Sequence, residues 1–397
     1  MIGSELPKGW DIQPLKEVVT STKGKKPKQL SELPFDNSIP YIDIKALEKD
    51  LIEQYADVES SKSFSPNDIA VVWDGARCGW VSKSKEGAIG STICALTPKN
   101  NIESNYLYYF LLEKYPIVNS KGRGVGIPHV DPTFFWDMEV PIPSPKEQKQ
   151  IAEKLDKLFG QIETIKEAFN KIPELLKNFR QQVLTYAVTG KLIESTPEPR
   201  MLGELIDELK YGTSKKADYD IEGFPVLRIP NINNGEIDSS DLKYVPLDDK
   251  EYNQLSLQEG DILVIRSNGS LSIVGQCAIV RKECENWVYA GYLIRIRCTH
   301  ELLPEYLNYI FKSYQVRKQI VKKSHSMSGV NNFSADKIKQ LEIAWYPVEV
   351  QKQIVEKLNS IFGKLNEIEK QYNTLSEKLD KLPQTLLCKA FKGELNR

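Results

Sequence analysis

The chain has 397 residues, more than one ordinary domain holds, and 41% of them are hydrophobic and 27% charged. This mixture is typical of globular proteins and excludes a disordered or fibrous one. No run of about 18 apolar residues occurs and the first residues lack an apolar stretch, so neither a membrane span nor a standard secretion signal is predicted. The formal net charge of −1 excludes a protein that holds nucleic acid by bulk positive charge.

The 6 cysteines form no CxxC pair, and the 3 histidines show no spacing typical of metal ligands. This pattern excludes a zinc finger or ribbon, and no metal site is predicted. Scattered, unpaired cysteines are typical of reduced thiols, so a cytoplasmic location is expected.

Residues 1–145 are predicted to form a first α+β domain, because short β-rich segments alternate with Gly, Asn and Pro and an aromatic helix follows them. Basic, turn-rich segments in it are candidates for DNA contact, with a solvated loop as the alternative for each. Arg77 follows a predicted strand and could reach a guanine edge, whereas the lysines suit phosphates. The candidates are Lys23, Lys25, Lys26, Lys28, Arg77, Lys121 and Arg123.

Residues 146–192 are predicted to form a first long helix, in which apolar residues are separated alternately by four and three positions. This spacing places them on one narrow stripe, as in the seam of a coiled coil. The alternative is a helix that buries one face against its own domain. Pro173 should kink or restart the helix without ending the stripe. The predicted interface residues are Ile151, Leu155, Leu158, Ile162, Ile165, Phe169, Ile172 and Leu176.

Residues 193–346 are predicted to form a second α+β domain that resembles the first loosely. For example, Asp68–Val72 resembles Asp261–Ile265, and Tyr106–Tyr109 resembles Tyr306–Tyr309. Arg266 and Asn268 follow the equivalent strand, and their side chains suit guanine and adenine respectively. The candidates for DNA contact in this domain are Lys215, Lys216, Arg266, Asn268, Lys322, Lys323 and Ser326.

Residues 347–397 repeat the first helix at an offset of 203 residues. Gln148–Ile151 recurs as Gln351–Ile354, and the register holds without a gap from there to Leu192 and Leu395. Pro383 has no counterpart in the first copy and should also kink or restart its helix. The stripe of this copy is Ile354, Leu358, Ile361, Leu365, Ile368, Tyr372, Leu375 and Leu379.

The order domain, helix, domain, helix indicates a duplicated half. Antiparallel packing of the two helices as a coiled coil would give the α+β chain pseudo-two-fold symmetry. Residues 1–145 carry 16 Lys and Arg against 19 Asp and Glu, and residues 193–346 carry 19 against 22. Each domain is therefore acidic overall, and any nucleic-acid site must be a local patch on it.

This arrangement resembles the DNA-specificity (S) subunit of Type I restriction–modification systems along essentially the whole chain. The resemblance rests on the Pro-x-Pro and Glu-Gln helix start at residues 141–151, the Ala-x-x-Gly-x-Leu helix end at 187–192, and the duplication of both around two divergent domains. In the second copy Val350 replaces the Glu of the Glu-Gln pair, which makes the start of that helix less certain.

The resemblance implies a non-catalytic subunit with two target recognition domains, each of which binds half of an asymmetric, bipartite site in double-stranded DNA. It also implies that the helices act as a spacer and as a platform for two methyltransferase (M) subunits, and that restriction (R) subunits join the full complex. AdoMet, ATP and Mg would then be bound by the partner subunits, with no cofactor in this chain, in a prokaryotic cytoplasm and without a membrane.

Two other functions are alternatives to this one. A self-contained DNA methyltransferase is disfavoured, because no glycine-rich cofactor loop follows a strand; Asp131–Phe134 resembles a target-base loop, but turn chemistry explains it better. A coiled-coil scaffold without a DNA role is the second alternative. No local motif pairs Ser or Cys with His, so no catalytic site is predicted.

Overall fold

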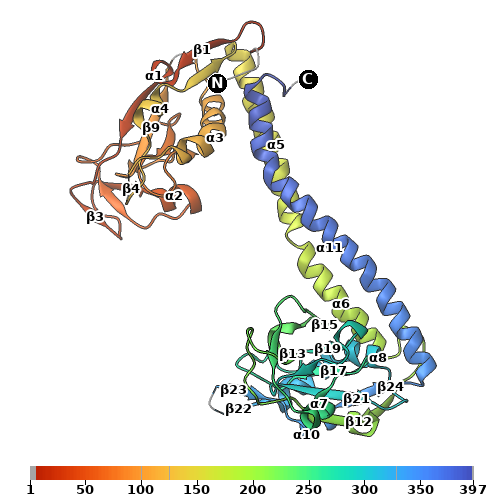
Figure 1. Ribbon diagram of the computed structural model, residues 1–397. Helices are drawn as coiled ribbons and strands as arrows, with labels where there is room; N and C mark the ends of the chain where they lie inside the picture. Colours follow the sequence, from red (N-terminus) through yellow and green to blue (C-terminus); the bar gives the residue numbers. More distant parts are fainter. Residues whose placement is uncertain (1–5, 100, 125, 328, 396–397) are drawn as a thin grey trace. The chain divides into compact units, whose positions relative to one another are not determined.

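The computed structural model describes residues 6–99, 101–124, 126–327 and 329–395, with the side chains of residues 325–327 left out. It consists of two compact units (Figure 1). Unit 1 comprises Met1–Asn170 and Thr374–Arg397, and unit 2 comprises Lys171–Asn373. Each unit is an α+β domain with two helical segments attached, as the sequence predicts.

The domain of unit 1 is built on an antiparallel four-stranded sheet with the order β2-β9-β6-β7, and a second sheet has the order β3-β5-β4-β8. Strand β6 is buried along its whole length, because its Ile-Ala-Val-Val sequence faces core on both sides. The elements are β1 (Asp11–Pro14), α1 (Leu15–Val18), β2 (Val19–Lys23), β3 (Leu30–Ser31), β4 (Ser38–Ile42), α2 (Ile44–Lys49), β5 (Tyr55–Asp57), β6 (Ile69–Val72), β7 (Val81–Lys83), β8 (Ala88–Ile89), β9 (Ile93–Pro98), α3 (Ser104–Ser120), α4 (Pro132–Trp136) and β10 (Glu139–Ile142).

The domain of unit 2 repeats this construction with a sheet of the order β12-β21-β17-β19, in which β17 is the buried counterpart of β6. It adds a three-stranded sheet, β18-β23-β22, beside the main one. The elements are β11 (Glu198–Met201), β12 (Ile206–Tyr211), β13 (Phe224–Leu227), β14 (Ile232–Asn233), β15 (Glu236–Ile237), β16 (Lys243–Val245), α7 (Asp249–Leu255), β17 (Ile262–Ile265), β18 (Ser267–Asn268), β19 (Cys277–Ile279), β20 (Val288–Tyr289), β21 (Leu293–Cys298), α8 (Pro304–Ile310), α9 (Tyr314–Lys323), β22 (His325–Met327), β23 (Val330–Asn332), α10 (Ala335–Lys339) and β24 (Glu342–Trp345).

The long helices are α5 (Pro145–Phe169), α6 (Ile172–Val188) and α11 (Val348–Phe391). The helix does restart at Pro173, which lies in the first turn of α6. The helix does not restart at Pro383, because α11 continues through it. Proline removes one backbone hydrogen bond there, and the burial of Leu387, Ala390 and Phe391 in the core of unit 1 holds the following turns in place.

The start of each long helix is fixed by a buried glutamine of the repeat. Gln148 Nε2 donates to the carbonyls of Asn101 and Pro143, and its Oε1 accepts from the Glu103 amide. Gln351 does the same with the carbonyls of Glu301 and Tyr346 and the Leu303 amide. Val350 therefore does not displace the second helix, which begins 203 residues after the first.

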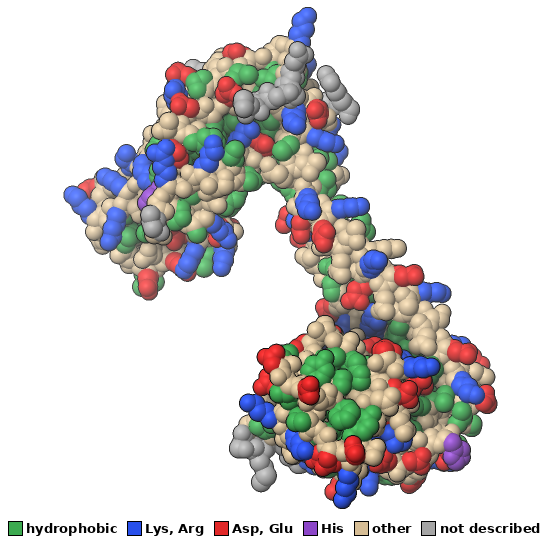
Figure 2. Space-filling view, viewed as in Figure 1, with side chains coloured by type: hydrophobic (Ala, Val, Ile, Leu, Met, Phe, Trp, Pro, Cys, Tyr) green, Lys and Arg blue, Asp and Glu red, His purple; other side chains and the backbone are tan. Residues whose placement is uncertain are grey.

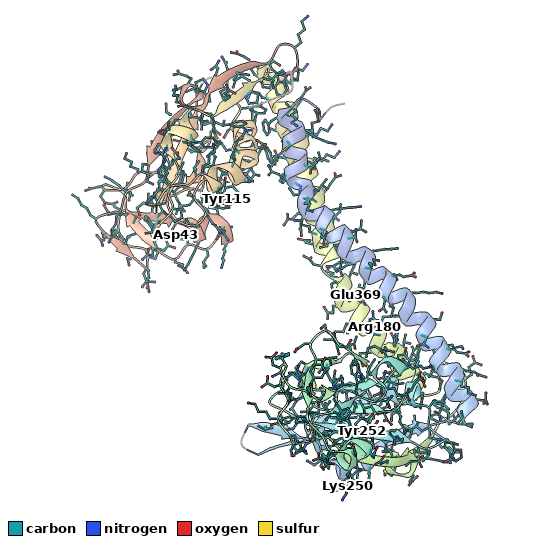
Figure 3. The ribbon with its side chains drawn as sticks, in the orientation of Figure 1. Asp43, Tyr115, Arg180, Lys250, Tyr252 and Glu369 are labelled. Carbon is teal, nitrogen blue, oxygen red and sulfur yellow. The ribbon has the colours of Figure 1, made fainter. Side chains whose placement is uncertain are left out.

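Within each unit the helices run antiparallel and make reciprocal contacts. Lys154 Nζ donates to the Leu395 carbonyl in unit 1 (2.7 Å), and Lys357 Nζ donates to the Leu192 carbonyl in unit 2 (3.1 Å). Each lysine thus holds the end of the other repeat's helix. Farther along α6, Arg180 Nη2 pairs with Glu369 Oε2 of α11 at 2.9 Å (Figure 3).

The predicted stripe is most deeply buried near the domains, where Ile151, Leu155, Ile354 and Leu358 are at most 3% exposed. Farther along the helices the stripe opens to solvent, and Ile165, Ile368 and Leu375 are 49%, 46% and 50% exposed. Two packed helices cover only a narrow strip of each other, so these apolar side chains keep about half of their surface. No helix in the part of the chain that the structure describes is apolar and long enough to cross a membrane.

Candidate nucleic-acid interface

In unit 1, sheet topology brings predicted DNA-contact residues to one edge. Strands β2 and β6 both pair antiparallel with β9, so they run parallel to each other and end at the same side. Lys23 ends β2, and Asp74 lies just beyond β6. Lys23 Nζ therefore meets Asp74 Oδ2 at 2.6 Å and lies 5.5 Å from the centre of the Trp73 ring.

The loop that contains Lys121 and Arg123 is tied to this edge through its backbone. Arg123 and His129 exchange two backbone hydrogen bonds of 2.8 and 2.7 Å, and the Gly75 amide donates to the Pro128 carbonyl. The residues on both sides of Arg77 are tied to the end of α3, because Asn119 Nδ2 donates to the Ala76 and Cys78 carbonyls. Lys23, Arg77, Lys121 and Arg123 thus come from loops that converge on one edge of the domain.

Acidic and aromatic partners hold these cations in place. Arg77 pairs with Glu48 of α2, Arg123 Nη2 lies 2.6 Å from Asp131 Oδ2, and Lys121 Nζ lies 4.0 Å from the centre of the Phe134 ring. The side chains of Arg77 and Arg123 are 56% and 65% exposed. Their carboxylate partners, Glu48 and Asp131, are only 20% and 13% exposed, so it is the guanidinium groups that remain accessible to a DNA phosphate.

Asp74 lies between two basic groups, because His129 Nδ1 is 2.7 Å from its other oxygen. Burial alone would raise the pKa of Asp74, but the hydrogen bonds from Lys23 and His129 hold that pKa below its usual value. The edge of unit 1 is therefore a mixed surface, and Figure 2 shows acidic side chains among the Lys and Arg side chains of this unit.

Three further candidates lie on the connection between β2 and β3. Lys25, Lys26 and Lys28 are exposed there. Their side chains take no part in the contacts described above among the residues of the sheet edge. Their geometry suits phosphate contact but gives no base-reading position.

In unit 2 the corresponding edge carries different side chains. Strands β12 and β17 both pair antiparallel with β21, so Tyr211 and Arg266 reach the same side. The Arg266 guanidinium carbon lies 4.8 Å from the centre of the Tyr211 ring. An arginine that stacks on an aromatic face keeps its N–H donors at the ring's edge, where they can reach a base.

The added sheet of unit 2 extends this edge. Strand β18, which contains Asn268, pairs with β23, and β22 completes the sheet. Asn268 Oδ1 accepts from the Ser270 amide at 2.9 Å, and Asn331 Nδ2 donates to the Gly269 carbonyl at 2.9 Å. The candidates Asn268 and Ser326 thus belong to one sheet, in strands β18 and β22 on either side of β23, and Arg266 directly precedes β18. The Ser326 side chain lies outside the described part.

The remaining lysine candidates of unit 2 fall into two places. Lys215 Nζ lies 2.5 Å from Glu251 Oε2, and Lys216 beside it is exposed. Lys322 and Lys323 end α9 and line a cavity of about 420 Å³ together with Gln319, Lys337 and Gln340. Three lysines around one hollow suit a phosphate.

Sequence reasoning missed the partners of the candidate cations. Glu48, Asp74, His129 and Glu251 lie 29 to 55 positions from the residues they contact, and no local motif marks them. Lys337 was missed as well, because it is one of two lysines in the short helix α10. Asp131, whose motif resembles a methyltransferase loop, caps α4 through the Thr133 and Phe134 amides, which is turn chemistry as expected.

Comparison with known proteins identifies relatives over the whole chain. Residues 7–174 and 195–377 match the Type I restriction modification DNA specificity domain. The EcoKI specificity subunit of Escherichia coli (strain K12) is 33% identical over 429 residues, which cover 100% of this chain and 91% of that protein. The StySPI specificity subunit of Salmonella potsdam is 30% identical and covers 98% of this chain and 90% of that protein.

Solved structures show the same fold. A chain from work on complex assembly and conformational transition of the type I R-M system superposes with a TM-score of 0.74 at 18% identity, over 98% of this chain and 100% of that one. The HsdS subunit from Thermoanaerobacter tengcongensis gives a TM-score of 0.67 at 17% identity, over 99% of both chains.

Proposed function

The chain belongs to the Type I restriction–modification DNA specificity subunits, and from this premise we propose that each of its two domains reads one half of a bipartite, asymmetric site in double-stranded DNA. The observation that carries the proposal is the contrast between scaffold and edge. The two domains share a sheet order and helix-start contacts, but they present different side chains at the same sheet edge. Two readers on one scaffold with different surfaces would recognise two different half-sites.

In this proposal the edges contact DNA with distinct chemistry. In unit 1, Lys23, Arg77, Lys121 and Arg123 contact phosphates or guanine after exchanging their carboxylate partners. In unit 2, Arg266 reads guanine from its place on Tyr211, and the strands around Asn268 enter a groove. Lys322, Lys323 and Lys337 neutralise backbone phosphates.

The chain itself is proposed to be non-catalytic. Methyltransferase (M) subunits, two per chain, would dock on the long helices, and restriction (R) subunits would complete the complex in a prokaryotic cytoplasm. The half-exposed apolar residues Ile165, Ile368 and Leu375 support docking, since apolar stripes of this kind suit a protein partner. AdoMet, ATP and Mg would be bound by those partners, and absence of AdoMet binding by the purified chain would test this division of labour.

A domain exchange tests the two-reader proposal. Residues 1–145 would be replaced by the corresponding region of a related specificity subunit, and DNA methylation by the complex with M subunits would be mapped. One half of the site should change and the other should stay the same. A change in both halves of the site would contradict the proposal. If the complex still recognised its full site after the candidate residues at both sheet edges had been replaced, a scaffold role would be favoured.

A further inference from the structure

A cavity of about 490 Å³ lies inside unit 2, where helix α6 meets the second domain. Among the described residues that line it, Lys177, Lys312 and Arg317 are cationic and none is a carboxylate. The remaining wall includes amide side chains such as Asn233 and Gln181. Figure 2 shows Lys and Arg side chains in the recess between α6 and this domain. The cavity is separate from the sheet edge described above.

Lys312 is positioned by a tight hairpin turn. Asn234 and Gly235 both have positive φ angles, 48° and 93°, and join β14 to β15, as Asn-Gly turns commonly do. The Asn234 carbonyl accepts a hydrogen bond from Lys312 Nζ at 2.8 Å. A Cβ at position 235 would lie 2.1 Å from that nitrogen, so glycine is needed for the lysine to reach this place.

The ammonium of Lys312 still has binding capacity. Its hydrogen bond to Asn234 is the one it makes to a described residue, so two of its three N–H donors have no protein acceptor. Burial lowers the pKa of Lys312, because the ammonium loses hydration there. Glu236, a carboxylate whose charge acts on it, pairs with Arg281. An anion in the cavity would restore the interactions that water provides elsewhere.

Arg317 shapes the opposite wall of the cavity. Its Nη1 donates to the Val274 carbonyl at 2.8 Å, and its Nη2 donates to the Leu271 and Ser272 carbonyls at 3.1 and 3.3 Å. These bonds use three of the five N–H donors of the guanidinium, and because all three acceptors are carbonyls they do not neutralise its charge. The cavity therefore keeps the full charge of Arg317 next to that of Lys312.

Unit 1 shows that the fold does not require these cations. Gln181 donates to the Lys312 carbonyl, and its repeat counterpart Gln384 donates to the Glu113 carbonyl, so Glu113 takes the place of Lys312. Lys177 corresponds to Asp380 at the offset of 203 residues.

The unit 1 counterpart of the third cation, Arg317, is found from a close contact of a glycine in each unit. Gly275 lies against Ile320 as Gly79 lies against Val118, which aligns Arg317 with Tyr115 of α3 (Figure 3). Three cations in unit 2 thus replace two acids and a tyrosine on the same scaffold. Since the scaffold is stable with either set, the positive charge points to a ligand.

We propose that this cavity of unit 2 binds a phosphate group. A tetrahedral oxyanion suits the cavity, because lysine and arginine donors can approach its oxygens from several sides and neutralise its charge. The phosphate comes either from a DNA backbone outside the recognition edges or from a free phosphate compound. The inference does not depend on which bases the two domains read.

Thermal unfolding of the full chain in inorganic phosphate, compared with chloride at equal ionic strength, tests the first step. Phosphate should raise the unfolding temperature of the wild-type chain, since a ligand that binds only the folded state stabilises it. Lys312→Met and Lys177→Gln should each lose most of that rise. Lys318→Gln is the matched control, because Lys318 is exposed on α9 and does not line the cavity. An equal rise in all four proteins would overturn the proposal.

The second step identifies the source of the phosphate. Binding of a random-sequence duplex is measured at low salt over a range of salt concentrations. If the phosphate belongs to DNA, each cavity variant should reduce the slope of log affinity against log salt by about one, and Lys318→Gln should not. If only the phosphate-dependent temperature rise is lost, the ligand is a free phosphate compound.

The two steps also separate this inference from the proposed function. No effect of the cavity variants in either measurement would overturn the phosphate site. The half-site methylation pattern would remain unchanged in that case, because the cavity lies outside both recognition edges. Lys177→Gln guards against misfolding as an explanation, since this side chain is exposed and its replacement leaves the core intact.

Discussion

The two units share a scaffold that is repeated residue by residue. Tyr109 Oη donates to Asp156 Oδ1 in unit 1, and Tyr309 Oη donates to Asn359 Oδ1 in unit 2, where position 359 is the repeat counterpart of position 156. Likewise, Tyr106 donates to the Pro141 carbonyl and Tyr306 to that of Ala344. The first pair of bonds joins each domain to its own long helix, and the second pair joins it to the strand that leads into that helix, β10 or β24. The duplicated part is therefore the joint between domain and helix.

The sheet edges differ between the same two units. Unit 1 places Lys23, Asp74 and His129 in one ion-paired group, whereas unit 2 places Arg266 on the Tyr211 ring and adds the sheet β18-β23-β22. A fixed joint with a variable edge lets one half change its contacts without disturbing its attachment. The comparison predicts that scaffold substitutions act alike in both units, and that substitutions elsewhere do not.

The largest expected effect on stability comes from a buried network of charged side chains in unit 2. The described residues of unit 1 contain no such network. Asp261 and Arg295 are 1% and 2% exposed, and Arg297 Nε lies 2.8 Å from Asp261 Oδ1. Asp261→Ala would leave two arginines without this partner and should reduce the free energy of unfolding of unit 2 by about 3–5 kcal/mol.

The unit 1 counterpart, Asp68, accepts instead from Thr97 Oγ1 at 2.6 Å. Asp68→Ala should reduce the free energy of unfolding of unit 1 by about 1–2 kcal/mol, because only neutral donors lose a partner. Both losses of unfolding free energy can be measured by urea unfolding, monitored in each unit by hydrogen exchange. Equal losses would show that the network of unit 2 is not held by charge.

The buried glutamines should give the next largest effect, and an equal one in both units. Gln148→Ala and Gln351→Ala each remove three hydrogen bonds and leave buried backbone groups without partners, which should cost about 3 kcal/mol. The matched controls are Gln150→Ala and Gln353→Ala, because these glutamines of the same repeat are exposed. If one unit tolerated the change, the joint would not be a true repeat. The same unfolding measurement applies.

The sequence predicts the long helices of this joint well, because the repeat contains their pattern twice. Gln148 and Gln351 belong to the identical segments that set the offset of 203 residues, and the apolar stripe follows from spacing alone. Both copies also place the helix start correctly despite Val350. Local residue spacing is enough to predict a helix and the residues at its start.

The edges could be predicted only in part. The position of Arg77 and Arg266 after a buried strand was visible, since both follow β-rich segments. Their partners were not, because Glu48 and Tyr211 come from other elements and are brought near by the sheet order. The continuation of α11 through Pro383 also depends on tertiary burial, which outweighs the local cost of proline.

A smaller effect concerns charge at the edge of unit 1. Asp74→Asn would free Lys23 and His129 from their carboxylate and should strengthen binding of random-sequence DNA several-fold, with a steeper salt dependence. Asp137→Asn is the matched control, because it also removes an acid paired with a lysine, Lys16, by an exposed contact elsewhere. An equal gain in both variants would mean that net charge alone governs binding.

This comparison holds near neutral pH. Because the pKa of Asp74 is lowered in the folded chain, its contribution to stability is complete above the unfolded value of about 4 and is lost as the pH falls through the lower folded value. The measured stability should therefore be insensitive to Asp74 titration between about pH 6 and 8. The difference in stability between the wild type and Asp74→Asn should stay constant in that range and become smaller as acid titration goes below it.

The smallest expected effect on stability comes from Lys154 and Lys357, and it tests whether the two units respond equally. Lys154→Met and Lys357→Met both remove an exposed hydrogen bond to a helix-end carbonyl, at 2.7 and 3.1 Å, and the loss of that bond should cost less than about 1 kcal/mol in each case. Lys149→Met and Lys352→Met serve as controls, because the ion pairs of these repeat lysines with described residues, Glu153 and Glu349, lie within their own helices. The two test variants should lower the unfolding temperature equally and by more than the controls. Each lysine holds the end of the other repeat's helix. Unequal losses of unfolding temperature would therefore show that the two contacts do not contribute equally to stability, although they are equivalent in the repeat.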